Sequence, residues 1–131
     1  AGVDARPFIR GQAQCFLSAG EHQAFSLDGT HRTTAIPPND NMDGVMAERD
    51  FDLTKIFAKS NQLSGTTLLI RVWNSTDNGA TWTEIALVKI SDGNREGTDS
   101  ASAFIQATSL YCFSVEAIGG SYFGPVSYLC I

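Results

Sequence analysis

The side chains that could carry out acid–base or nucleophilic chemistry are few in this chain and are scattered along it. Only two histidines occur, His22 and His31, and both fall in a poorly patterned first part of the sequence. Nucleophilic catalysis needs a serine or cysteine beside a positioned base, and the sequence contains no GxSxG motif. Paired carboxylates such as Asp50 and Asp52 are typical of turns and sheet edges. We therefore predict that the protein has no catalytic residues and is not an enzyme.

The candidate metal ligands have no spacing that is specific for a metal ion. The stretch 39–50, NDNMDGVMAERD, partly resembles a calcium loop but lacks the usual first aspartate and final glutamate. The three cysteines, Cys15, Cys112 and Cys130, include no CxxC pair, and their odd number argues against a full disulfide framework. We expect free thiols in a protein made in a reducing cytosol, and neither a metal nor a cofactor.

Charge and composition exclude two further classes of function. The net charge is −5, and the nine Lys and Arg residues are dispersed rather than gathered into the basic stripe of a nucleic-acid-binding protein. The apolar runs are too short to span a membrane. Charged residues make up only 18% of the 131 residues. This balance predicts one soluble β domain that binds neither nucleic acid nor a membrane.

The elements that must position the remaining side chains are predicted to be strands. Short apolar stretches alternate with Gly, Asn, Asp and Ser clusters, which is typical of a sandwich or barrel. A short helix is the alternative for the stretch RDFDLTKIFAKS, residues 49–60. Before residue 49 the apolar residues are sparse, with short strands possible only at 14–18 and 23–27. We expect an all-β fold, an antiparallel β-sandwich of jelly-roll or fibronectin-like type over 49–131, preceded by a loosely structured N-terminal arm over 1–48. The main candidate strands are 51–60, 66–73, 81–90, 103–109, 111–118 and 125–131.

The most distinctive motif is STDNGATW, which begins at Ser75. It resembles the Asp-box of sialidases and related β proteins, Ser-x-Asp-x-Gly-x-Thr-Trp, and the resemblance implies a β-hairpin turn whose catalytic residues lie elsewhere. Asp77 can accept backbone N–H bonds from the residues that follow it, and Gly79 tolerates the positive φ of such a turn. One box in 131 residues is too little for a sialidase propeller. The matching residues are Ser75, Asp77, Gly79, Thr81 and Trp82.

A cross-strand register follows if the two strands that flank this turn form a hairpin. Pairing Ile70 with Ile85 places apolar residues on one face and sets Arg71 opposite Glu84 on the other. The same register makes Trp73 and Trp82 cross-strand neighbours. We interpret the motif as a structural turn, and a carbohydrate or ion site at the turn remains the alternative.

The C-terminal stretch 110–131 has a second strand–turn–strand pattern. Its Tyr-x-Phe-x-Val-x-Ala alternation is similar to the final hairpin of fibronectin-type sandwiches. A register centred on Ser121 would place Cys112 opposite Cys130. Tyr122 and Phe123 would then lie at the hairpin tip, where they either fold back onto the core or meet a partner.

Small β-sandwiches with hairpins of this kind resemble structural proteins of tailed-phage virions. The resemblance implies a non-enzymatic capsid decoration (cement) protein, or a tail or fibre component, made in the host cytoplasm and incorporated into the virion. It also implies a homo-oligomer, a trimer, that binds a capsid or tail protein through its arm and loops. The predicted partner-binding residues are Trp73, Tyr122 and Phe123. The alternative is a secreted carbohydrate-binding module that uses Trp73 and Trp82.

Overall fold

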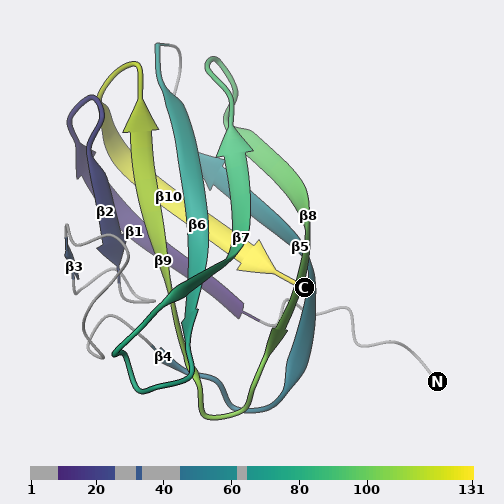
Figure 1. Ribbon diagram of the computed structural model, residues 1–131. Coiled ribbons are helices and arrows are strands. Elements are labelled where there is room, and N and C mark those ends of the chain that lie inside the picture. The colour runs from purple at the N-terminus through teal and green to yellow at the C-terminus, as the bar shows by residue number, and fades with distance from the viewer. Residues whose placement is uncertain (1–8, 26–31, 34–44, 62–64) are drawn as a thin grey trace.

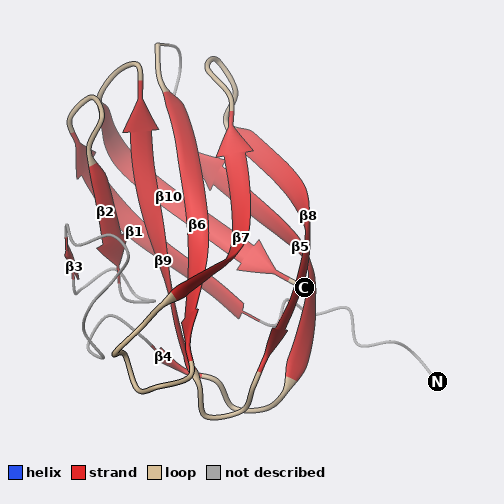
Figure 2. Cartoon of the chain, in the orientation of Figure 1, coloured by secondary structure: helices blue, strands red, loops and turns tan. Residues whose placement is uncertain are grey.

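A computed structural model describes residues 9–25, 32–33, 45–61 and 65–131 of the chain. The described part contains strands, turns and loops and no helix (Figure 2). Residues 51–60 form a strand rather than the alternative helix. The strands are β1 (Ile9–Leu17), β2 (His22–Phe25), β3 (Arg32–Thr33), β4 (Val45–Met46), β5 (Phe51–Ser60), β6 (Thr67–Ser75), β7 (Thr83–Ile90), β8 (Glu96–Ile105), β9 (Leu110–Ile118) and β10 (Tyr122–Cys130).

The strands form two antiparallel sheets that face each other (Figure 1). The first sheet has the order β1-β10-β5-β8, and the second has the order β3-β2-β9-β6-β7, with β4 pairing to β9. Apart from the β6–β7 hairpin, successive long strands alternate between the two sheets. This connectivity is that of a jelly roll, which confirms the predicted antiparallel sandwich and selects the first of its two expected types.

The core lies between the sheets, and period-two alternation supplies it. On β6, Leu68, Ile70 and Val72 are fully buried, and on β10 the buried positions are the even-numbered residues from Tyr122 to Cys130. Phe113 of β9 connects the two layers because its ring lies 4.8 Å from that of Tyr128 on β10. Neither apolar face can be buried within its own sheet. Packing the two sheets together is the arrangement that removes both faces from water.

The predicted N-terminal arm is wrong for residues 9–17 and 22–25. Strand β1 pairs with β10 along its whole length, and β2 pairs with β9. Ile9, Leu17 and Phe25 are each no more than 2% exposed in the core. The sequence of β1, IRGQAQCFL, was misleading because its inward-facing positions hold small residues as well as large ones. Residues 1–8, 26–31 and 34–44, which include His31 and most of the calcium-like loop, lie outside the described part.

The predicted C-terminal hairpin is also wrong. Strands β9 and β10 are consecutive but belong to different sheets, so the turn at Gly119 and Gly120 crosses from one layer to the other. Cys112 pairs with Trp73 on β6, whereas Cys130 pairs with Ile9 and Ile56 in the other sheet. A hairpin and a crossover have the same alternation and the same glycine turn in the sequence. The fibronectin-like alternative falls with this register.

The β6–β7 hairpin forms, but its register differs from the predicted one. Ile70 pairs with Val88 rather than Ile85, and Trp73 pairs with Glu84 rather than Trp82. Two features explain the error. A seven-residue loop, 76–82, separates the strands, and a β-bulge lies between the Val72 and Trp73 pairings. The sequence of β7, TEIALVKI, is apolar on both sides, so alternation alone could not choose the face that turns inward.

Candidate functional site

The Asp-box forms a closed set of hydrogen bonds at the end of the β6–β7 hairpin. The Asp77 carboxylate accepts the Thr81 backbone N–H at 2.8 Å and the Thr81 hydroxyl at 2.5 Å. Ser75 Oγ lies 2.8 Å from Asp77 Oδ1 and accepts the Gly79 backbone N–H at 2.8 Å. The hydrogen bonds from Thr81, with that from Ser75, lower the pKa of Asp77 to about 2. The carboxylate is therefore a structural acceptor that stays charged.

The backbone of this turn needs residues that tolerate the left-handed region. Asn78 has a φ of 60° and Gly79 a φ of 91°. Asparagine visits this region more readily than most residues, and glycine does so without steric cost. The motif spacing is thus explained by the turn itself. Ser75 and Asp77 accept backbone N–H groups, Thr81 donates its hydroxyl to Asp77, and Gly79 permits the backbone conformation.

Trp73 and Trp82 pack together with Cys112 in a cluster separate from the main core. The cluster lies on the outer side of the second sheet, because Trp73 and Ile70 are an odd number of residues apart on β6. The exposed fractions are only 8% for Trp73 and 7% for Trp82, and Cys112 is fully buried. The two indoles therefore do not present the open platform that the carbohydrate-binding alternative requires. Trp73 is likewise not a partner-binding side chain in the free monomer.

Ser114 of β9 contacts both Trp73 and His22. The sequence alone did not connect His22 with either residue. The Ser114 hydroxyl accepts the Trp73 indole N–H at 2.9 Å and lies 2.9 Å from His22 Nε2. Burial, and the nearby positive charge of Arg71, lower the pKa of His22 although Glu116 opposes them. A neutral His22 ring can accept the Ser114 hydroxyl proton at Nε2. The three side chains thus link β2, β9 and β6 on the outer side of the sheet.

This serine–histidine pair has the composition of a nucleophile and its base, but its setting is structural. Ser114 is fully buried, so its oxygen is closed to a substrate. The same oxygen already accepts the Trp73 N–H, which reduces its nucleophilicity. The pair was hidden in the sequence by a separation of 92 residues. Only the antiparallel pairing of β2 with β9 brings the two side chains together.

Arg71 forms the charged centre of this outer face. Its guanidinium contacts Glu84 of β7 and Glu116 of β9, each at 2.8 Å. The expected proximity of Arg71 and Glu84 is therefore present, although the backbone partner of Arg71 is Leu87. The bulge offsets β7 and makes the contact diagonal. One cation held between two carboxylates binds three neighbouring strands together rather than awaiting an anionic ligand.

The first sheet presents a different kind of surface on its outer side. Phe16 of β1 and Phe123 of β10 are cross-strand partners with ring centroids 6.4 Å apart. They are 52% and 64% exposed. Of the two aromatics expected in a hairpin tip, Tyr122 turns inward, is 5% exposed and receives the Asn61 backbone N–H at its hydroxyl. Phe123 points outward. The sequence could have indicated Phe16 only if the β1–β10 pairing were known.

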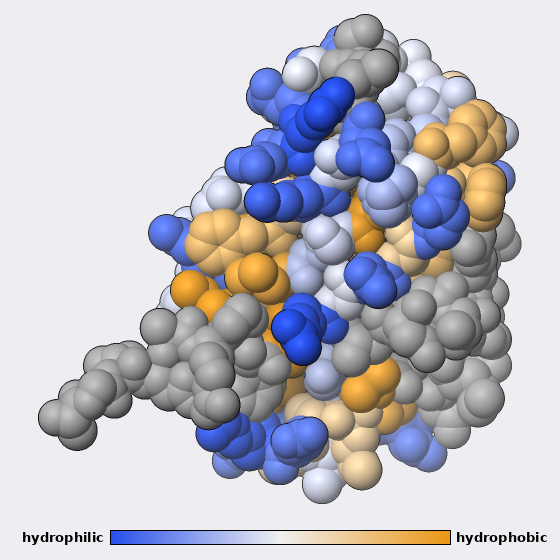
Figure 3. All heavy atoms as spheres, turned by 180° about the vertical axis from the view of Figure 1, so that it is seen from behind, coloured by the Kyte–Doolittle hydropathy of each residue, from blue (hydrophilic) through white to orange (hydrophobic). Residues whose placement is uncertain are grey.

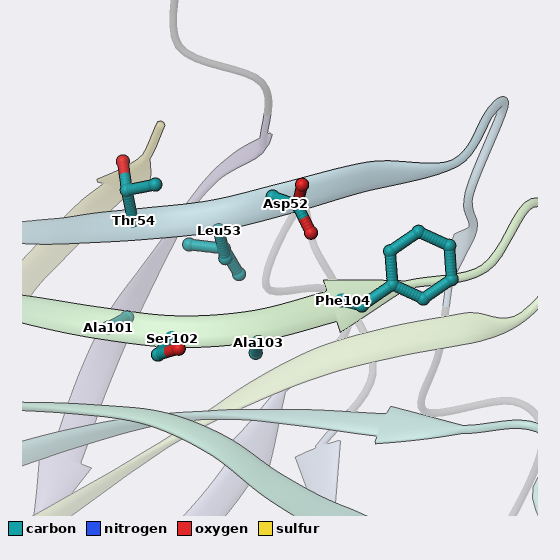
Figure 4. A pocket seen from close by; sticks show the side chains of 7 residues that line it. All are labelled: Asp52, Leu53, Thr54, Ala101, Ser102, Ala103 and Phe104. Carbon is teal, nitrogen blue, oxygen red and sulfur yellow. The ribbon is translucent and has the colours of Figure 1, made fainter.

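An open hollow lies between β5 and β8 (Figure 4). Asp52 of β5 and Phe104 of β8 are cross-strand partners at one end of it. Asp52 is the one ionisable side chain among its seven lining residues. Within the described ranges, no group of three or more His, Cys, Asp or Glu side chains could hold a metal ion. The lining residues are Asp52, Leu53, Thr54, Ala101, Ser102, Ala103 and Phe104.

Three buried thiols complete the inventory of reactive groups. No disulfide joins Cys15, Cys112 and Cys130, and all three are fully buried. Burial raises the pKa of Cys130 to about 12, so its reactive thiolate form is scarce at neutral pH.

Among the described residues, no helix is long and apolar enough to cross a membrane.

Comparison with known proteins reveals similarity only at the level of structure. No family model matches the chain, and no curated protein matches its sequence. One similar solved structure is that of Eiger TNF from S. frugiperda, at 10% identity and a TM-score of 0.44, covering 96% of this chain and 94% of that one. The globular domain of the zebrafish complement 1qA protein has 9% identity and a TM-score of 0.48, with 96% of each chain covered.

A viral protein is also similar in structure. The infectious bursal disease virus VP2 subviral particle has 9% identity and a TM-score of 0.34. The alignment covers 98% of this chain but 36% of that one, so this chain spans about a third of its length. At these identities and TM-scores, the similarities do not assign the chain to a family.

Proposed function

We propose that the protein is a non-enzymatic structural component of a virion, a capsid decoration (cement) protein of a tailed phage, that assembles as a homo-oligomer. The observation that carries this proposal is the exposed Phe16–Phe123 pair on the outside of a jelly-roll sandwich. Exposed apolar groups gathered on one surface are typical of interaction sites. Jelly rolls are recurrent folds of viral capsid domains, although a fold alone does not decide a function.

The use of the polar side chains supports a structural role. His22, Ser114, Arg71 and Asp77 each stabilise a strand pairing or a turn. A virion component needs an accessible surface, and the exposed Phe16–Phe123 pair supports this part of the proposal. The trimeric state and the contact with a capsid or tail protein belong to the proposal. The carbohydrate-binding alternative is not retained because the indoles of Trp73 and Trp82 are buried.

Co-sedimentation tests the proposal directly. Purified protein is mixed with empty shells assembled from the major capsid protein of the proposed phage, and the shells are pelleted. We expect saturable binding at a fixed number of copies per shell subunit. A pellet that contains no more protein than the control without shells would overturn the decoration role. Turnover of a sialoside or an RNA substrate that is abolished by His22→Ala would instead establish an enzyme.

A further inference from the structure

The outer side of β1 and β10 carries a row of uncharged side chains that begins after Arg10, here called the β1–β10 face. Odd-numbered positions of β10 and even-numbered positions of β1 point away from the core and pair across the two strands. Phe16 and Phe123 form one end of the surface, and the half-buried Leu129 forms the other. Its members are Gln12, Gln14, Phe16, Phe123, Pro125, Ser127 and Leu129.

Figure 3 views the molecule from the side of this sheet. Hydrophobic side chains, in orange, lie among pale and blue ones across the surface rather than in one deep hollow. None of the seven members is ionisable. Two basic side chains border these members near Leu129. Arg10 of β1 is the cross-strand partner of Leu129, and Lys59 of β5, which ion-pairs with Glu96, is the partner of Ser127.

We propose that the β1–β10 face binds a second copy of this chain. The charge distribution points to this occupant. Each copy carries a net charge of −5, so two copies repel one another wherever their acidic surfaces meet. The face has no acidic member and is bordered by the basic Arg10 and Lys59, so two copies can approach there without opposing carboxylates. A strongly basic partner would have to lose hydration there and would gain no counter-charge.

The polar members of the face also suit contact with their own copies. A glutamine amide and a serine hydroxyl each contain both a donor and an acceptor. Gln12, Gln14 and Ser127 can therefore bond to the same residues of another copy around a symmetry axis. A twofold dimer demands this kind of self-complementary surface. Phe16 and Phe123 add aromatic area, which is enriched in the centres of interfaces.

The size of the face predicts weak association. Two strands of about nine residues cover roughly 10 by 30 Å, given strand spacings of about 4.8 Å and a rise of about 3.3 Å per residue. That footprint is smaller than the roughly 800 Å² per partner of a standard stable interface. We therefore expect a dissociation constant in the micromolar range, so the measurement must extend to about 100 μM protein.

Sedimentation velocity on the full chain between about 1 and 100 μM tests the inference. We expect the wild type to pass from monomer to dimer across this range. The double variant Phe16→Ser/Phe123→Ser should associate at least tenfold more weakly. Phe104→Ser is the matched control because Phe104 is 57% exposed on the same sheet but lies on β8. It should associate like the wild type.

A second variant keeps the test decisive if the double variant does not fold. Gln14→Glu places a like charge in the centre of the face without changing the core, and Ser102→Glu, on the exposed side of β8, is its control. Loss of association in Gln14→Glu alone supports the inference. A wild type that stays monomeric at 100 μM, or face variants that associate as strongly as the wild type, overturn it.

The inference deepens the homo-oligomeric part of the proposed function, and the two can fail separately. Self-association that is lost in the face variants, combined with no binding to capsid shells, would leave the inference standing and remove the decoration role. Shell binding by a wild type that remains monomeric would do the reverse.

Discussion

The outer faces of the two sheets differ in how far their side chains are covered within the monomer. On the second sheet, side chains from β2, β6, β7 and β9 bond to one another, and the Trp73–Trp82–Cys112 cluster is buried within the same monomer. On the first sheet, the cross-strand pair Phe16–Phe123 stays more than half exposed. The outer face of the second sheet is therefore part of the fold, and the outer face of the first sheet is available to a partner. Aromatic content alone therefore does not distinguish a binding surface from a structural one.

The difference arises from the Asp-box loop. A seven-residue connection is long enough to bring Trp82 back toward Trp73, so the second sheet gains a small satellite core. On the first sheet, Phe16 and Phe123 are 52% and 64% exposed. Substitutions on the two faces should consequently have opposite profiles. Those on the second sheet should reduce stability, and those on the first should reduce association.

The largest expected effect is that of Trp73→Ala. The substitution removes a buried indole and leaves Ser114 without the N–H that it accepts. We expect the free energy of unfolding to fall by about 3–5 kcal/mol, as for other buried aromatic truncations. Urea denaturation of dilute protein measures it.

Trp73→Phe provides the matched control. It keeps most of the packing and removes only the N–H donor, so the expected cost is about 1–3 kcal/mol. A loss below about 1 kcal/mol for Trp73→Ala would mean that the cluster is as dispensable as an exposed surface. The contrast between the two faces would then disappear.

Gly79→Val should have the next largest effect. Gly79 has a φ of 91°, and a β-branched residue resists that conformation. We expect a loss of about 1–3 kcal/mol from strain in the Asp-box turn. The neighbouring position is the control, because Asn78→Gly places a permissive residue at a φ of 60° and should change stability little. An unchanged melting temperature for Gly79→Val would contradict the role of this turn in positioning Trp82.

The strands themselves were largely predictable from the sequence, and their partners were not. Residues 51–60 form a strand with the predicted bounds, because alternation and the flanking turn residues are local signals. The β9–β10 crossover was missed because the same local signals describe a hairpin. Strand β8, Glu96–Ile105, was misplaced since its exposed, small and polar residues hide the alternation. Pairing between distant strands depends on the whole set of apolar faces, which no single segment contains.

The functional residues follow the same rule. The hydrogen bonds of the Asp-box lie within seven residues and could be anticipated from Ser75, Asp77 and Gly79. The contact between His22 and Ser114 spans 92 residues, and the Phe16–Phe123 pair depends on the β1–β10 register. These contacts become visible only once the topology is known. The sequence singled out Phe123 because it follows a glycine turn. In the structure Phe123 is exposed because it lies at an outward-facing position of β10.

A smaller effect is expected from pH, through His22. Burial and Arg71 lower the pKa of His22 below its ordinary value of 6.5, against the opposing influence of Glu116. The folded state thus favours the neutral ring. The contribution to stability is fully present above pH 6.5 and is lost as the pH falls through that value toward the lower pKa of the folded state. The ring is only half-buried, which limits the size of the change.

The measurement is the free energy of unfolding of the wild type and of His22→Gln between pH 7.5 and about 5. Both proteins retain His31 and all the carboxylates, so the difference between their slopes isolates His22. We expect the wild type to lose stability more steeply on acidification. Equal slopes would show that the ring is solvated and that the outer face of the second sheet is looser than its hydrogen bonds indicate.

The smallest effect on stability should be that of Phe123→Ser. The ring is 64% exposed and lies outside the core, so at about 1 μM protein we expect a change within about 0.5 kcal/mol. At about 100 μM the outcome should differ. Association stabilises a folded state in proportion to the logarithm of protein concentration, so the wild type should melt at a higher temperature than at 1 μM. Phe123→Ser should show a much smaller rise. A loss of several kcal/mol in the dilute variant would place Phe123 in the fold itself and would remove the distinction between the two faces.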